Sequence, residues 1–265
     1  MPKKFSCVAV GWDYAYDLCR DVREEMRKAG FVPEVVVGVA RGGWYLARVL
    51  CDFFLLKDLV SLKTEHWGLT ATVTGAAEMK FGLDDAAKQK IRGRRVLVAD
   101  DVTDTGDSVK LVVEYLESQE VGAGAKEVRT ATLHHKTSSP FVPDFYGELV
   151  KDWKWVVYPW SVHEDLMDLV AKVVSKSGKA EPRGEEGRMS LSEIRAALKQ
   201  EFDFYVPFHL LREVLENMQF HGKIKIKKEK EEKEEGEGEG GAGGGGRGKE
   251  GAGGGGRGKE VWLLR

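Results

Sequence analysis

The order of hydrophobic segments predicts an α/β protein in which a mostly parallel sheet is flanked by helices. Short β-branched runs alternate with amphipathic stretches of helical length over residues 1–175. The run EVVVGVA, residues 34–40, has no polar alternation, which is typical of a strand buried on both faces. A smaller helical region and a glycine-rich tail follow this α/β part.

The first elements follow from apolar spacing and turn residues. Apolar side chains recur every fourth position between residues 13 and 29, and Gly30 follows them, which predicts an amphipathic helix with a glycine C-cap. By the same reasoning, strands are expected at 34–40, 59–65, 96–99 and 127–135, and helices at 43–54 and 109–117. Strands that alternate with helices in this way form parallel βαβ units.

Two later stretches complete the first domain. Residues 66–83, HWGLTATVTGAAEMKFGL, have weak periodicity and are expected to form a functional loop or flap. The aromatic run WKWVVYPW, residues 153–160, is expected to be a strand, followed by a helix of about ten residues that begins near His163. We expect this domain to end at residue 175, before a polar linker at 176–188.

The region after the linker is predicted to be a small helical or winged-helix domain over residues 189–228. Ser190 and Glu193 form a capping-box pair at the start of one helix, Pro207 can open a second, and KIKIK alternates as a strand. The tail, residues 229–265, is rich in Glu and Gly and is expected to be disordered. Its apolar end, VWLLR, could return as the second strand of the wing.

Composition excludes several classes of protein. The chain has 41 basic and 43 acidic residues, a net charge of −2, so no overall field favours nucleic acid or a membrane as a partner. Three cysteines, Cys7, Cys19 and Cys51, match no metal-ligand spacing and are expected to be reduced, packed thiols. With no signal-peptide core and no long apolar run, we expect a soluble, cytoplasmic protein.

The stretch VLVADDVTDTGDS, residues 96–108, leads a strand directly into acids, hydroxyls and a glycine. Free backbone N–H groups, hydroxyls and a helix N-terminus at one point are suited to hold a phosphate. The residues that supply this cradle are Thr103, Thr105, Gly106 and Ser108. Because carboxylates repel a phosphate, Asp100 and Asp101 are expected to bind ribose hydroxyls together with Mg²⁺.

This stretch resembles the phosphoribosyl-pyrophosphate (PRPP) motif of type I phosphoribosyltransferases, and VGVARGGW, residues 37–44, resembles their pyrophosphate loop. The resemblance implies the mostly parallel fold of that family. It also implies PRPP binding by Ala40, Arg41, Gly42, Gly43, Asp100, Asp101, Thr103, Asp104, Thr105, Gly106, Asp107 and Ser108. In these terms Asp104 and Arg41 are the catalytic residues, Asp100 and Asp101 hold the metal, and the peptide bond before Arg41 is often cis.

A third stretch, LHHKTSSPFVPDFYG followed by KWVVYPW, resembles the base-binding region of purine phosphoribosyltransferases, best those of archaea. By this resemblance Lys136 faces the six-position of the purine, Trp155 stacks on its ring, and Val156 offers backbone groups to its edge. An ammonium at Lys136 favours a 6-oxopurine over adenine because it would meet the adenine amino group donor to donor. Both bases stay open, since adenine-using archaeal members can look like oxopurine enzymes.

The function that the resemblance implies is purine salvage. The enzyme, a homodimer with Mg²⁺ as its cofactor, would transfer 5-phosphoribosyl from PRPP to N9 of a purine base and release pyrophosphate. The alternative is a transcription regulator that keeps this fold to sense a nucleotide and binds DNA through its winged helix. We do not expect a nucleic-acid partner, because the helix over residues 207–222 carries few basic groups against its acids and amides.

Overall fold

The computed structural model describes residues 5–67, 73–119, 123–179, 188–229 and 259–264. The chain forms two compact units, the first of residues 1–168 and 201–204, the second of residues 169–200 and 205–265. The division after residue 168 falls inside helix α5, Val162–Lys179, whereas the sequence predicts a boundary near residue 175. Of the expected linker, residues 180–187 lie outside the described part of the chain.

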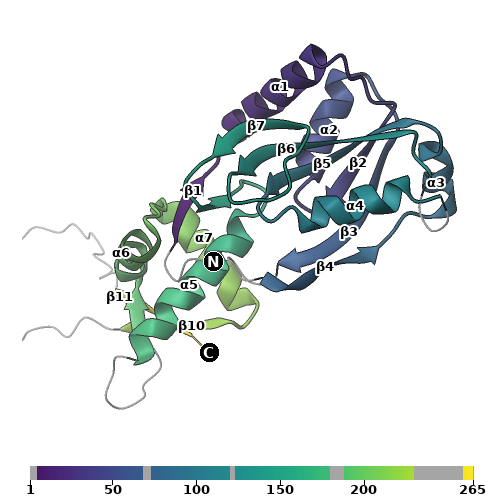
Figure 1. Ribbon diagram of the computed structural model, residues 1–265. Helices are drawn as coiled ribbons and strands as arrows, with labels where there is room; N and C mark the ends of the chain where they lie inside the picture. The colour runs from purple at the N-terminus through teal and green to yellow at the C-terminus, as the bar shows by residue number, and fades with distance from the viewer. Residues whose placement is uncertain (1–4, 68–72, 120–122, 180–187, 230–258, 265) are drawn as a thin grey trace, which may run out of the picture. The chain divides into compact units, whose positions relative to one another are not determined.

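The first unit is built on a six-stranded sheet with the strand order β4-β3-β2-β5-β6-β7 (Figure 1). Its strands are β2 (Val35–Ala40), β3 (Leu59–Trp67), β4 (Val73–Phe81), β5 (Arg95–Thr103), β6 (Glu127–Lys136) and β7 (Phe145–Val150). Every neighbouring pair is parallel except β3 and β4. A separate parallel pair joins β1 (Ser6–Ala9) to β8 (Lys154–Val157). This α/β architecture confirms the predicted fold class.

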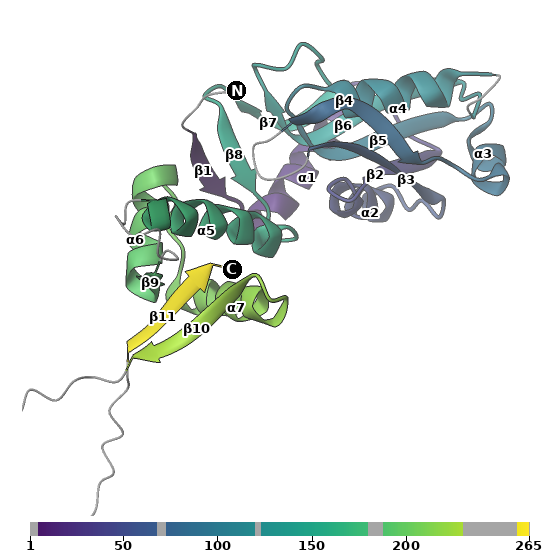
Figure 2. The ribbon, with the colours of Figure 1, turned by 90° about the horizontal axis from the view of Figure 1, so that it is seen from below.

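Helices cover both faces of the main sheet (Figure 2). They are α1 (Trp12–Lys28) and α2 (Trp44–Phe53) on one face, and α3 (Asp85–Ile91) and α4 (Asp107–Glu117) on the other. Successive strand residues alternate between the two layers: Val36 and Leu97 pack with α1 and α2, whereas Val37 and Val98 pack with α3 and α4. Burial on both faces explains why these strands read as continuous apolar runs.

The structure differs from the sequence prediction at several elements. Strands β1 and β7 were not predicted, and the interval between residues 67 and 95 holds β4 and α3 besides loop. Helix α5 has 18 residues, because apolar side chains keep helical spacing as far as Val174. The expected flap corresponds to the end of β3 and to β4, and its residues 68–72 lie outside the described chain.

The second unit contains α6 (Leu191–Phe202), α7 (Phe208–Phe220) and a three-stranded sheet in the order β10-β11-β9. Its strands are β9 (Arg188–Ser190), β10 (Ile224–Glu229) and β11 (Lys259–Leu264). The capping box is confirmed, since Glu193 accepts from the Ser190 backbone N–H at 2.6 Å and the Ser190 hydroxyl accepts from the Glu193 N–H at 3.3 Å. The antiparallel pairing of β10 with β11 confirms the expected return of the apolar C-terminal end.

Two further expectations concern the cysteines and the membrane. Cys7, Cys19 and Cys51 are buried free thiols, as predicted. None of the helices in the described ranges is long and apolar enough to cross a membrane.

Candidate functional site

The candidate site lies where the loops after β2 and β5 meet. Strand β2 ends at Ala40 and leads through residues 41–43 into α2, and β5 ends at Thr103 and leads through residues 104–106 into α4. Because β2 and β5 are parallel neighbours, both loops and both helix N-termini leave the same edge of the sheet. The peptide bond between Ala40 and Arg41 is cis, as the resemblance implies.

The loop after β2 packs so closely against β5 that two of its positions require glycine. A Cβ atom at Gly42 would overlap the Asp101 carboxylate, and one at Gly43 would overlap the carbonyl oxygen of Ala99. Backbone of the first loop therefore lies directly against the acid pair of β5.

The loop after β5 also depends on a glycine. Gly106 has a φ of +82°, and a Cβ atom there would overlap the Phe141 side chain. Gly106 is the N-cap of α4, so the free N–H groups of that helix face the loop. Thr103, by contrast, is 1% exposed, and its hydroxyl bonds to that of Thr132 at 3.1 Å.

Two adjoining cavities open at this edge. The phosphate-side cavity, about 450 Å³, is lined by every residue predicted to bind PRPP except Gly43, Thr103 and Asp107. The aromatic-side cavity, about 590 Å³, is lined by the three predicted base-binding residues, Lys136, Trp155 and Val156, and by Trp44, Tyr45, Tyr158 and Trp160. Five residues line both cavities, namely Arg41, Gly42, Asp101, Val102 and Asp104. The structure thus brings the two predicted sets of residues together at a shared wall.

The acid pair lies inside β5 rather than after it. Burial raises the pKa of Asp100 well above its ordinary value, and the neighbouring Asp101 raises it further. Burial also raises the pKa of Asp101, to about 6, against the opposite influence of the Trp160 indole. Ionising both carboxyls is therefore costly in the free protein, and a bound cation would offset that cost.

Asp104 is held from two sides. Its Oδ2 accepts a hydrogen bond from the Lys136 ammonium at 2.6 Å, and its Oδ1 accepts one from the Trp153 indole N–H at 2.9 Å. The side chains of Lys136 and Asp104 are 2% and 9% exposed. Burial lowers the pKa of Lys136, and the Asp104 carboxylate opposes that shift. Each carboxylate oxygen keeps a second lone pair for a ligand.

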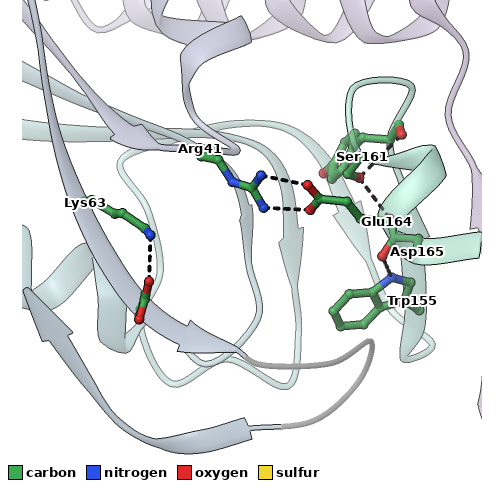
Figure 3. Close-up of polar contacts among 8 residues, drawn as sticks. Arg41, Lys63, Trp155, Ser161, Glu164 and Asp165 are labelled. Atoms are coloured by element: carbon green, nitrogen blue, oxygen red, sulfur yellow. Dashed lines mark hydrogen bonds and ion pairs between the residues drawn. The ribbon is translucent and has the colours of Figure 1, made fainter. Parts of the chain in front are cut away.

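Trp155 is fixed by a carboxylate of α5 (Figure 3). Its indole N–H donates to Asp165 Oδ1 at 2.8 Å, and the Ser161 hydroxyl donates to Asp165 Oδ2 at 2.8 Å. Burial raises the pKa of Asp165 to about 6, although both hydrogen bonds lower it. The indole that is predicted to stack on a base is therefore oriented through the N–H at its edge.

Arg41 reaches across the cavity mouth to Glu164 on α5 (Figure 3). Two hydrogen bonds of 2.7 and 2.6 Å join the guanidinium to the carboxylate, and this contact raises the pKa of Arg41. A planar guanidinium that makes such a paired contact is also suited to a phosphate. On the opposite wall Lys63 provides a second cation, paired with Glu65 at 2.6 Å.

The sequence analysis missed Lys63 and Trp153. Lys63 and Glu65 lie near the carboxyl end of β3, so the rule that sites form at the carboxyl ends of parallel strands could have found them. Trp153 stands within the aromatic run WKWVVYPW, but nothing in the run shows that its N–H reaches Asp104.

A comparison with protein families finds one match over this region. The family model described as "Phosphoribosyl transferase domain" matches residues 13–165, more than half of the chain and all of the site described above.

The solved structures that are similar to this chain include three from different organisms. A purine phosphoribosyltransferase from Pyrococcus horikoshii is 27% identical, with a TM-score of 0.47 over 58% of this chain and 93% of that one. A hypothetical protein from Neisseria gonorrhoeae with bound ppGpp is 23% identical, with a TM-score of 0.50 over 64% and 99%. A xanthine-guanine-hypoxanthine phosphoribosyltransferase from Helicobacter pylori is 20% identical, with a TM-score of 0.45 over 60% and 94%.

Proposed function

The chain belongs to the type I phosphoribosyltransferase family of glycosyltransferases, and we propose that its reaction is the transfer of 5-phosphoribosyl from PRPP to N9 of a purine base. In this reaction the bond from ribose C1 to pyrophosphate breaks, the bond from C1 to N9 forms, and the base gives up a proton. The product is a nucleoside 5′-monophosphate.

The position of Asp104 is the observation that carries the proposal. Asp104 lines both cavities, between a wall of glycine-rich loops and a wall of aromatic side chains. A sugar phosphate in the first cavity and a planar base in the second would meet at this carboxylate. This position supports a role for Asp104 in stabilising positive charge at the reacting centre or in accepting the proton of the base.

The phosphate-side cavity has donors for both phosphate ends of PRPP. The backbone of loop 104–106, with the hydroxyls of Thr105 and Ser108 and the N-terminus of α4, fits the 5′-phosphate. Arg41 and Lys63 on the other walls supply the positive charge that a departing pyrophosphate needs. In the closed complex, exclusion of water would protect the activated sugar from hydrolysis.

Asp100 and Asp101 fit a magnesium ion. Carboxylate oxygens are ligands that Mg²⁺ prefers, and Asp100 and Asp101 both line the phosphate-side cavity. Within the described ranges, no three His, Cys, Asp or Glu side chains converge on one point, so two carboxylates would leave several ligand positions to water and substrate oxygens. When bound, the ion would neutralise charge on the ribose and pyrophosphate oxygens.

The aromatic-side cavity fits a planar heterocycle. Trp155 offers a face for stacking, and the Lys136 ammonium is a buried donor beside it, 5.9 Å from the Trp155 ring centroid. We propose that a 6-oxopurine is preferred to adenine, because its carbonyl oxygen can accept from Lys136 whereas the adenine amino group cannot.

A single assay tests the proposed function. The chain is incubated with PRPP, Mg²⁺ and each of adenine, hypoxanthine, guanine and xanthine, and pyrophosphate release is measured. Release with at least one purine is expected, with hypoxanthine or guanine ahead of adenine. The absence of release with every base, together with tight and salt-sensitive binding of DNA, would instead support a regulator.

A further inference from the structure

Asp104 and Lys136 form a buried ion pair, and one further side chain contacts both members. The Trp153 indole N–H donates to Asp104 Oδ1, and the Lys136 Nζ lies 4.2 Å from the centroid of the Trp153 ring. An ammonium over an indole face is attracted to the ring, most strongly where water is excluded. Trp153 therefore fixes the carboxylate through its edge and the ammonium through its face.

Trp153 does not belong to the wall of either cavity. It stands just before β8, in the connection from β7. Any effect on a substrate must consequently pass through the two residues that it holds. Such a side chain fixes a reactive group within a narrow range of positions without touching the ligand.

Trp153 is itself supported by two phenylalanines. The ring of Phe5, just before β1, meets the Trp153 ring edge to face, with centroids 5.9 Å apart and planes at 87°. Phe202 packs on Phe5 with a centroid distance of 5.2 Å. Phe202 is the last residue of α6 and lies in segment 201–204, which is part of the first compact unit although the rest of α6 is not.

We propose that Trp153 is a positioning residue for Asp104 and Lys136, and that segment 201–204 supports it through Phe202 and Phe5. Segment 201–204 would thus have a role in the reaction without supplying a group that touches the substrate. This inference rests on the proposed function, because Asp104 matters only if the chain transfers phosphoribosyl groups.

The decisive variant is Trp153→Phe. Phenylalanine keeps an aromatic face for Lys136 and Phe5 but has no N–H for Asp104. We expect kcat to fall about tenfold, whereas KM for PRPP and for the purine stays within about twofold, because the loss concerns placement of a reactive group. A cooperative thermal unfolding transition serves as the control that the variant is folded.

A double-mutant cycle separates positioning from general support of the fold. In an Asp104→Asn background, Trp153→Phe should lower kcat by less than about twofold, since the group that it positions no longer acts. An equal loss in both backgrounds, or unchanged kcat in the wild-type background, would overturn the proposal. The wild-type chain is assayed first. If it releases no pyrophosphate with any purine, the proposed function is refuted, and this inference with it. If it is active but the variants behave otherwise than expected, only this inference is refuted.

Phe202→Ala tests the contribution of the C-terminal segment, with Phe202→Leu as the variant if alanine prevents folding. We expect a fall in kcat of about threefold that again disappears in the Asp104→Asn background. Phe220→Ala is the matched control, because Phe220 lies in the same C-terminal region on α7 but is 85% exposed; it should leave kcat unchanged. Equal losses from Phe202→Ala in both backgrounds, or no loss, would exclude a role for the segment.

Discussion

The two cavities of the site are built in different ways. The phosphate-side cavity is made mainly from two short loops, each contiguous in sequence, in which glycines bring backbone close to the ligand space. The aromatic-side cavity is made mainly from side chains of α2, of β6, of the region around β8 and of α5, and several of these side chains bond to one another. The first cavity depends on backbone shape, whereas the second depends on pairs of side chains.

This difference determines how each cavity should respond to substitution. A glycine in a close-packed loop has no substitute, because any Cβ displaces the backbone N–H groups that we propose to bind the ligand. A paired side chain can be replaced by an isosteric residue, and the loss then measures charge or a single hydrogen bond. We therefore expect the largest effects on the phosphate side and graded effects on the aromatic side.

Gly106→Ala should have the largest effect. Alanine at a φ of +82° is strained, and its Cβ would overlap Phe141, so the loop must move and the proposed phosphate donors must move with it. We expect kcat/KM for PRPP to fall about 100-fold or more. Steady-state kinetics with PRPP as the varied substrate measures this loss.

Gly30→Ala is the matched control for that substitution. Gly30 has a φ of +66° at the end of α1, and nothing lies within 4 Å of an added Cβ. Its replacement should cost stability through the same backbone strain, on the order of 1 kcal/mol, yet leave kcat/KM for PRPP unchanged. Similar kinetic losses in both variants would show that strain alone, and not the position of the loop, is responsible.

Asp104→Asn should have the next largest effect. The amide keeps the shape of the carboxylate but carries no charge, so kcat should fall at least about tenfold while KM for PRPP changes little. Lys136 then stays buried without its partner, and its pKa should fall further below the ordinary lysine value. Initial rates measure kcat and KM, and calorimetry measures the affinity for PRPP.

A double variant controls for the unpaired lysine. Asp104→Asn combined with Lys136→Met removes both charges, so it should recover stability lost in the single variant by about 3 kcal/mol without recovering kcat. If kcat returned with stability, the loss in Asp104→Asn would be structural and the role of the carboxylate in the reaction would be refuted.

The same difference explains how much of the site the sequence could predict. The glycines, acids and hydroxyls of the stretches 37–44 and 96–108 are close together in the sequence, so local pattern is enough to find them. Most of these residues line the phosphate-side cavity. Thr103 is the instructive exception: on a buried strand end, its hydroxyl can bond to a neighbouring strand as well as to a ligand, and here it bonds to Thr132. Residue type alone does not distinguish these two partners.

The aromatic side could be predicted only in part. Lys136 and Trp155 follow from the resemblance, but Asp104 lies 32 residues from its partner Lys136 and 49 from its partner Trp153. The fold could also be predicted only in part. The buried strands were predicted from their apolar runs, whereas β1 and β7 were not predicted. Contacts between distant segments depend on the completed fold and leave no local pattern.

Burial of the Asp165 carboxyl should make the stability of the free protein depend on pH, and Asp165→Asn should remove that dependence. The ordinary pKa is 3.8 and the folded value is about 6, so at low pH both states are protonated and no cost arises. Between these values the unfolded state ionises first, and stability falls until the pH passes the folded pKa. Removing the group should therefore raise the free energy of unfolding by about 3 kcal/mol at pH 7.5, and by less than about 1 kcal/mol at pH 4.

Urea unfolding of the wild-type chain and the Asp165→Asn variant at both pH values tests this prediction. The amide oxygen can still accept from Trp155, and the amide N–H can donate to Ser161, so the geometry should survive. A gain of the same size at both pH values, or a loss at pH 7.5, would mean that the ionised carboxyl is not the source of the cost.

Glu164→Gln should have the smallest effect and the opposite sign. Arg41 must leave Glu164 if it is to bind pyrophosphate oxygens, so the ion pair competes with the substrate. The two side chains are 64% and 59% exposed, so the contact is worth at most about 1 kcal/mol, and its loss should lower KM for PRPP by about two- to fivefold. Asp52→Asn, which removes an equally exposed partner from Arg48 on α2, is the control and should leave KM unchanged. A higher KM in Glu164→Gln would show instead that Glu164 holds Arg41 in its binding position, and Arg41 would then resemble Trp155, a side chain oriented by its partner on α5.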